Sequence, residues 1–229
     1  HVMWQDDMTR QNDLRIRHRD TQDQLGEENT LLQAELELKE NKAKADEQNR
    51  LYDRIASEVE SQLIKADELL RRIEEEPGNN RDLIAKLCVL GSYIKRRGNL
   101  LLLGEENGVI QTRELEYCIR ESMDNLNLAG VFTSLSSKCD GCLALRSIVA
   151  AYDFYEELVE RLLDDMTAMM VNLTCADGTV RMNIQMGCRE EIAQQVLEGI
   201  ELPFGSFRYE LMEEDVVIDL TITEGGGSK

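Results

Sequence analysis

The sequence predicts an α plus α/β protein in which a parallel coiled coil, a helical hairpin and a small α/β sandwich follow one another along the chain. Three observations lead to this fold class. Apolar residues recur at a coiled-coil period from Leu31 onward, Pro77-Gly78 separates two helical patterns, and strand and helix patterns alternate after Gly130. The expected domains are 1–50 for the coiled coil, 51–104 for the hairpin, 105–224 for the α/β domain and 225–229 for a flexible tail.

Composition and charge narrow the classes of protein and partner. The 229 residues are 42% hydrophobic and 31% charged, which is typical of a folded, helix-rich chain. A net charge of −19 repels a phosphate backbone, so we expect no nucleic-acid partner. The chain has no run of about 18 apolar residues. We therefore expect a cytoplasmic protein that meets a membrane only through a domain outside this chain.

The first helix carries the seam of the coiled coil. Its mostly apolar positions, spaced alternately by three and four, include Leu31, Leu38, Asn41, Ala45, Gln48, Tyr52, Ile55 and Val59, and the same period continues to Ile73. A stripe of this kind on a lone helix has nothing to pack against, so we expect a homodimer. The amides Asn41 and Gln48 favour a two-stranded parallel arrangement in one register.

A helical hairpin follows. We expect the first helix to stop at Pro77-Gly78 and Asn79, Asn80 or Asp82 to cap the second. The second helix has an apolar stripe that would pack back on the first, made of Leu83, Leu87, Leu90 and Ile94 and widened by Ile84, Cys88 and Gly91. Two such hairpins form a dimeric four-helix bundle.

The α/β domain is predicted element by element. After a loop at 104–108, Thr112 begins a helix whose inward residues are Leu115, Ile119, Met123 and Leu126. A strand at 131–135 and a loop at 136–142 precede a long helix at 143–166, with Ile148, Tyr152, Tyr155, Val159 and Leu162 inward. Two strands then meet at the turn Ala176-Asp177-Gly178, and a helix and two more strands follow at 168–175, 179–186, 189–200, 204–212 and 215–223. Core-filling methionines are expected at Met169, Met170, Met182 and Met186.

Three stretches carry a resemblance to a known family: Arg54-Ile55-Ala56-Ser57-Glu58-Val59, Glu114-Leu115 through Gly130-Val131, and Glu157-Leu158-Val159-Glu160-Arg161. Together with the order of elements, they resemble the dimerisation hairpin and the GHKL ATPase-like domain of bacterial sensor histidine kinases, over about residues 51–223. The resemblance implies two-component signal transduction, with a response regulator or another signalling protein as a partner besides the second copy.

The chain differs from that family at each position that the family uses for phosphoryl transfer or nucleotide binding. The phosphoacceptor histidine falls near Glu60, the magnesium-binding asparagine on Arg161, and the adenine-binding D-x-G-x-G on Gln185-Met186-Gly187, with no room for a lid over ATP. We therefore expect a pseudokinase with no catalytic residue and no cofactor. One alternative is a coiled-coil adaptor or scaffold without signalling chemistry. The other is a divergent active kinase, which alone would use ATP and magnesium.

Cysteines offer the nearest thing to a metal site. Cys139 and Cys142 have the spacing of a zinc knuckle or a redox pair, and Cys175 and Cys188 would be needed to complete four thiolates. Half a motif without a nearby histidine favours reduced, buried thiols, so we expect no metal.

Two further sites, a basic cluster and a histidine, each have a functional interpretation and a simpler one. Lys95-Arg96-Arg97 favours a solvated helix face over a contact for an acidic partner such as a receiver domain. His18 favours a solvated histidine over a displaced phosphoacceptor, and the other histidine, His1, also lies outside the hairpin. No nucleophile with a base partner and no phosphate-binding loop is present.

Overall fold

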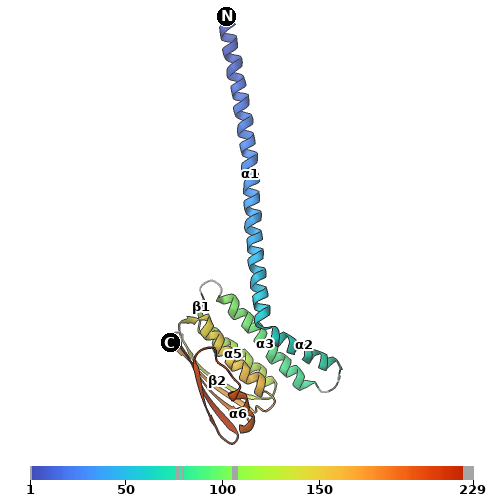
Figure 1. Ribbon diagram of the computed structural model, residues 1–229, viewed down its shortest axis with the longest axis vertical. Coiled ribbons are helices and arrows are strands. Elements are labelled where there is room, and N and C mark those ends of the chain that lie inside the picture. The colour runs from blue at the N-terminus through green and yellow to red at the C-terminus, as the bar shows by residue number, and fades with distance from the viewer. Residues whose placement is uncertain (1, 76–77, 79, 105–107, 224–229) are drawn as a thin grey trace. The chain divides into compact units, whose positions relative to one another are not determined.

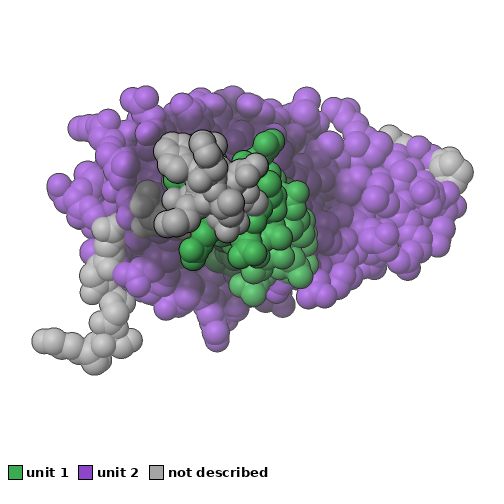
Figure 2. All heavy atoms as spheres, turned by 90° about the horizontal axis from the view of Figure 1, so that it is seen from above, with its two compact units in different colours: residues 1–54 green, residues 55–229 purple. Residues whose placement is uncertain are grey.

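The computed structural model describes residues 2–75, 78, 80–104 and 108–223. The chain forms two compact units, His1–Arg54 and Ile55–Lys229, which are coloured separately in Figure 2. The helices are α1 Val2–Glu58, α2 Glu60–Glu75, α3 Arg81–Leu103, α4 Arg113–Leu128, α5 Leu145–Leu162 and α6 Glu190–Glu198. The strands are β1 Val109–Gln111, β2 Phe132–Cys139, β3 Cys142–Ala144, β4 Ala168–Ala176, β5 Thr179–Gly187, β6 Ser206–Leu211 and β7 Asp215–Thr223. The α plus α/β class is confirmed.

The first unit consists of α1 up to Arg54. Its seam residues are open to solvent in the single chain: Leu38 is 71% exposed, and Leu31 and Tyr52 are exposed as well. A helix with exposed leucines at a seven-residue spacing is what a coiled-coil strand looks like without its partner. The coiled coil itself stays a prediction.

The helix is interrupted at Val59, which corrects the expected continuous seam. Val59 is only 2% exposed and belongs to the core of the second unit. Ile55 is half-buried, and a Cβ on Gly98 of α3 would lie 3.4 Å from its Cγ2. Ile55 and Val59 therefore pack within the single chain and are not free to face a second copy. The same apolar period continues along α2 as the side that faces α3, which is why the sequence pattern shows no break.

The hairpin of α2 and α3 forms as expected, but its burial differs. Pro77 and Asn79 lie outside the described residues. Asn80 precedes α3 without a side-chain cap, and its Nδ2 instead donates to the carbonyl oxygen of Ile73, 3.1 Å away. Ile84, Cys88 and Gly91 are exposed, which corrects the prediction that they widen the buried stripe. The buried side of α3 is rotated toward α4 and α5 because both helices pack against it.

A five-stranded mixed sheet completes the second unit, in the order β2-β4-β5-β7-β6. Only β2 and β4 are parallel; the other pairs are antiparallel. Helices α4, α5 and α6 contact one face of the sheet, and α5 lies between α3 and the sheet (Figure 1). On the open face, Asn183 donates to Asp219 Oδ1 over 2.7 Å and accepts from Asn172 over 3.4 Å. The sheet is therefore apolar toward the helices and polar toward solvent.

The structure tests the predictions for the turn at Asp177-Gly178, the inward helix residues, the loop and the methionines. The turn at Asp177-Gly178 has φ values of 50° and 70°, as a tight hairpin requires, and the inward residues of α4 and α5 are buried. The loop predicted at 136–142 is wrong, because β2 runs to Cys139 and a short β1–β3 pair follows. Met169, Met182 and Met186 are core residues, whereas Met170 is 40% exposed on the open face and corrects that expectation.

Among the described residues, no helix combines the length and the hydropathy needed to cross a bilayer.

Candidate functional site

A cleft of about 500 Å³ lies between α2, α3 and α5 in the second unit. Its floor is apolar, with Leu69, Val89, Leu90 and Leu163. Its walls carry both signs of charge, from the cations Lys65, Arg72, Lys86 and Arg161 and the acids Glu68, Asp153, Glu156, Glu157 and Glu160. This mixture of charges determines whether a phosphate group could bind in the cleft.

Two of the cations on the cleft walls pair with carboxylates of another segment. Lys65 of α2 pairs with Glu160 of α5, and Lys86 Nζ lies 2.6 Å from Asp164 Oδ2 in the turn after α5. Each pair joins a hairpin helix to α5 or its end. Because these side chains are partly exposed, each pair contributes about 0–1 kcal/mol. They orient the rim more than they stabilise the fold.

Arg97 is the one member of the basic cluster that is truly buried, at 7% side-chain exposure. Its NH2 lies 2.8 Å from Glu58 Oε2, and its Nε lies 3.0 Å from Asp153 Oδ1 as an ion pair without aligned hydrogen-bond geometry. Tyr93 donates its hydroxyl to the same Asp153 oxygen over 3.1 Å. Burial raises the pKa of Asp153, and Arg97 acts against that rise. The last turn of α1, α3 and α5 are thus joined through one guanidinium.

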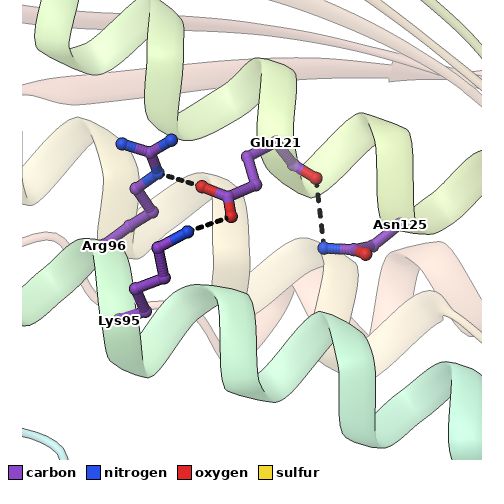
Figure 3. A network of polar contacts seen from close by, with 4 residues as sticks. All are labelled: Lys95, Arg96, Glu121 and Asn125. Carbon is purple, nitrogen blue, oxygen red and sulfur yellow. Dashed lines mark hydrogen bonds and ion pairs between the residues drawn. The ribbon is translucent and has the colours of Figure 1, made fainter.

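Arg96 and Lys95 attach α3 to α4 (Figure 3). Lys95 Nζ lies 2.6 Å from Glu121 Oε1, and Arg96 Nε pairs with Glu121 Oε2. Burial opposes ionisation of Glu121, but the hydrogen bonds from Lys95 and Arg96 hold its pKa below the ordinary value. The predicted solvated face is therefore wrong for Arg96 and Arg97. All three cations have carboxylate partners within the chain.

Glu156 is a buried acid on α5 whose importance the sequence did not indicate. Its Oε1 and the hydroxyls of Ser122 and Tyr152 have no hydrogen-bond partner among the described residues. Burial raises the pKa of Glu156 to about 8, against smaller opposing effects from Ser122 and Tyr152. The α-helical period turns Glu156 inward, whereas Glu157 and Glu160 line the rim.

The three positions that the family resemblance singled out do not come together. Glu60 is exposed at the start of α2, and Arg161 lines the cleft, 2.5 Å from Glu157. Gln185 is half-buried on β5, whose neighbours Ile184 and Met186 face the helices, so its side chain lies on the opposite, open face of the sheet. A guanidinium has no lone pair for magnesium and repels it. These residues do not fit a magnesium nucleotide.

The interior under α5 is filled by side chains. Val159 and Leu162 of α5, Ile184 and Met186 of β5, and Val216 and Ile218 of β7 are all fully buried in one core. Gly187, the surviving glycine of the motif, serves packing: a Cβ there would lie 2.6 Å from Thr167 Oγ1. That glycine therefore allows a close backbone contact within the protein.

The predicted cysteine cluster is only partly assembled. Cys139 Sγ lies 3.4 Å from Cys175 Sγ, Cys142 is exposed, and Cys188 is buried at the end of β5. Within the described ranges, no group of three or more His, Cys, Asp or Glu side chains could hold a metal. His18 is exposed on α1, and His1 lies outside the described residues.

Comparisons with known proteins give the following. No family model matches the chain, and no curated protein is similar to it in sequence. The histidine kinase domain of an Erythrobacter litoralis blue-light activated histidine kinase is similar in structure, with 9% identity and a TM-score of 0.43, over 73% of this chain and 93% of that one. The Acinetobacter baumannii histidine kinase AdeS is 10% identical with a TM-score of 0.36, over 74% and 98%.

A third solved structure, histidine kinase ThkA in complex with response regulator protein TrrA, is 11% identical with a TM-score of 0.35, over 76% of this chain and 61% of that one. The likeness to histidine kinase domains covers most of the chain at low identity. Function is inferred below from the residues of this chain.

Proposed function

We propose that this protein is the dimeric output region of a histidine-kinase-like signal transducer that works without nucleotide, as a pseudokinase. The observation that carries the proposal is the filled core under α5, together with a cation, Arg161, at the position implied for a magnesium ligand. Phosphoryl transfer needs a metal, a positioned nucleotide and an acceptor at once. With Glu60 in the acceptor position as well, none of the three has a suitable residue.

The second copy is proposed to cover the outer side of the hairpin. That side exposes large apolar residues on both helices, namely Leu63, Ile64 and Leu70 on α2 and Ile84 on α3. Cys88 and Gly91 continue it along α3 without a charge. The exposed stripe on α1 independently favours a second copy of the same chain as the occupant. Two hairpins joined in this way make the four-helix bundle that the sequence predicts.

The route for a signal would run through Arg97. Glu58 is the last residue of α1 and binds Arg97 of α3, which binds Asp153 of α5. A rotation or register change at the end of α1 would alter the Glu58 end of this network. Because Arg97 is buried, it cannot exchange that partner for water without a cost. The change would therefore alter the contacts of α5, on the sheet side of the hairpin.

Apart from the second copy, no contact among the described residues indicates which protein receives the signal. The basic cluster that would have attracted an acidic receiver domain is used internally. A response regulator remains the proposed partner on the family resemblance alone.

The dimer face is tested by sedimentation equilibrium on the full chain carrying Leu63→Asp and Ile84→Asp. We expect the dimer dissociation constant to rise at least about tenfold, which is about 1.4 kcal/mol, because two apolar contacts per copy are replaced by buried charges. The control is Leu128→Asp with Phe132→Asp, two exposed apolar residues outside the hairpin. An unchanged dissociation constant in the hairpin variant, or an equal rise in the control, would contradict the proposed face.

The absence of phosphoryl transfer is tested with labelled ATP and magnesium. We expect no stable label on the protein after prolonged incubation. Label that survives denaturation and maps to a residue of α2 would instead support the divergent kinase.

A further inference from the structure

Two buried thiols meet between β2 and β4. Cys139, the last residue of β2, is the register partner of Cys175 on β4, and the two Sγ atoms are 3.4 Å apart. Both side chains belong to the hydrophobic core. The sequence had suggested Cys139 with Cys142, but strand pairing brings Cys175 to it instead. The proposed function above uses neither residue.

The geometry of this pair suits a covalent bond. Directly paired residues on neighbouring strands lie about 4.8 Å apart, which is inside the Cα separation of about 4.4–6.8 Å that disulfides span. The sulfur atoms need to approach from 3.4 Å to about 2.05 Å. Side-chain rotation covers that change without moving either strand out of register.

Of the two paired thiols, Cys139 is the one that lines a hollow. This second hollow, of about 260 Å³, is also lined by Gln111, Arg113, Asp140, Gly141 and Cys142. Cys175 does not line that hollow. The hydrogen bond between the two thiols lowers the pKa of Cys139, while that bond and burial raise the pKa of Cys175. Cys139 is thus placed to react first and Cys175 to react second.

We propose that Cys139 and Cys175 are a redox-active pair that a hydroperoxide converts into a disulfide between β2 and β4. The Cys139 thiolate attacks the peroxide, its sulfur is oxidised to sulfenic acid, and the O–O bond breaks to release an alkoxide or hydroxide that takes up a proton. Cys175 then attacks the Cys139 sulfur, the S–S bond forms, and the sulfenic oxygen leaves as water with the Cys175 proton. A dithiol reductant reverses the product by exchange.

The alternative partner for Cys139 is Cys142. Cys142 is exposed on β3, where it pairs with Gln111 of β1 and not with β2 or β4. The core-directed side chain of Cys139 faces Cys175. A disulfide with Cys142 would require the turn at Asp140-Gly141, where Gly141 has a φ of 83°, to rearrange.

The test is to treat the reduced, full-length protein with hydrogen peroxide and map its disulfides by mass spectrometry of peptides. We expect one peptide pair joined through Cys139 and Cys175, with the loss of two thiols that dithiothreitol restores. Cys118, which is buried and whose pKa burial raises to about 12, serves as the internal control and should stay reduced. A Cys139–Cys142 link, or oxidation of Cys118 at the same rate, would overturn the proposal.

Variants separate the two roles. In Cys175→Ala, Cys139 should accumulate as sulfenic acid that a dimedone probe labels, because no second thiol resolves it. In Cys142→Ser, the link should form at the rate of the unaltered protein. If Cys175→Ala gave no dimedone label while remaining folded by circular dichroism, Cys139 would not be the reacting thiol. Because mapping of the unaltered protein is decisive by itself, failure of a variant to fold leaves that result standing. Neither measurement depends on ATP binding or on the dimer.

Discussion

One side of α3 is covered by the rest of the second unit, whereas the other side is not. On the covered side, Arg97 has two carboxylate partners and Leu100 is in the core. On the open side, Ile84 is 50% exposed, and Cys88 and Gly91 continue the apolar stripe. An exposed apolar stripe on the outer side of a helix supports the proposal that a second copy covers it. The covered side of α3 therefore stabilises the fold, whereas the open side is available to a partner.

The largest loss of stability is expected when the charge of Arg97 on the covered side is removed. In Arg97→Met we expect the free energy of unfolding to fall by about 2–4 kcal/mol, because Asp153 and Glu58, both partly screened by solvent, lose the buried cation that they share. Urea unfolding followed by circular dichroism measures this. The double variant Arg97→Met with Asp153→Leu should recover much of the loss, since it removes the unpaired charge. A loss below 1 kcal/mol in the single variant would mean that the network is not buried as described.

Glu156 also lies on the covered side, buried with its Oε1 atom lacking a hydrogen-bond partner among the described residues. Its pKa is raised from 4.5 to about 8, so between these values only the folded state holds the proton. Stability from this group is therefore unaffected below pH 4.5, falls as the pH rises through this window, and levels off above about 8. In Glu156→Gln we expect a gain of about 2–4 kcal/mol at pH 8.5 relative to the unaltered protein, and almost none at pH 4.5. Urea unfolding at both values measures it, and equal effects at the two pH values would contradict the assignment.

The redox pair makes a prediction of similar or smaller size. A bond between Cys139 and Cys175 closes a loop of 36 residues, so the oxidised protein should be more stable than the reduced one by about 2–4 kcal/mol. Thermal unfolding of the two forms, with Cys175→Ala treated identically as control, measures this. A variant that gained the same stability on oxidation would point to another bond.

The smallest effect is expected where a charge pair is exposed. Lys95→Ser should change the free energy of unfolding by about 0–1 kcal/mol, because Lys95 is mostly in solvent and Arg96 still binds Glu121. The matched comparison with Arg97→Met, two residues along the same helix, isolates burial as the cause. Equal losses in the two variants would remove the distinction between the sides of α3.

Elements with a strong local signal were predictable from the sequence. The turn at Asp177-Gly178 requires positive φ at both positions, and aspartate followed by glycine meets that need. The inward stripe of α5 repeats every three or four residues and is buried throughout. The sequence predicts a loop for the polar half of β2, because Ser136 and Lys138 face the open side of an edge strand and mimic loop composition.

Features that depend on packing between distant segments were not predictable. The period that marks the coiled coil continues without a change across Val59, so only the contact with α3 reveals where the intermolecular side ends. Arginine is rarely buried, and nothing near Arg97 in sequence announces Glu58 or Asp153. The Cys139–Cys175 contact likewise requires the order of the strands, because the two residues are far apart in the chain.

Isothermal titration calorimetry of the purified protein with ATP and magnesium, with ADP as control, tests whether the chain has a nucleotide pocket. The filled core under α5 and the cation at Arg161 predict no heat of binding up to millimolar nucleotide. Binding of ATP in the micromolar range would contradict the account, because it would require a nucleotide pocket that this core does not have.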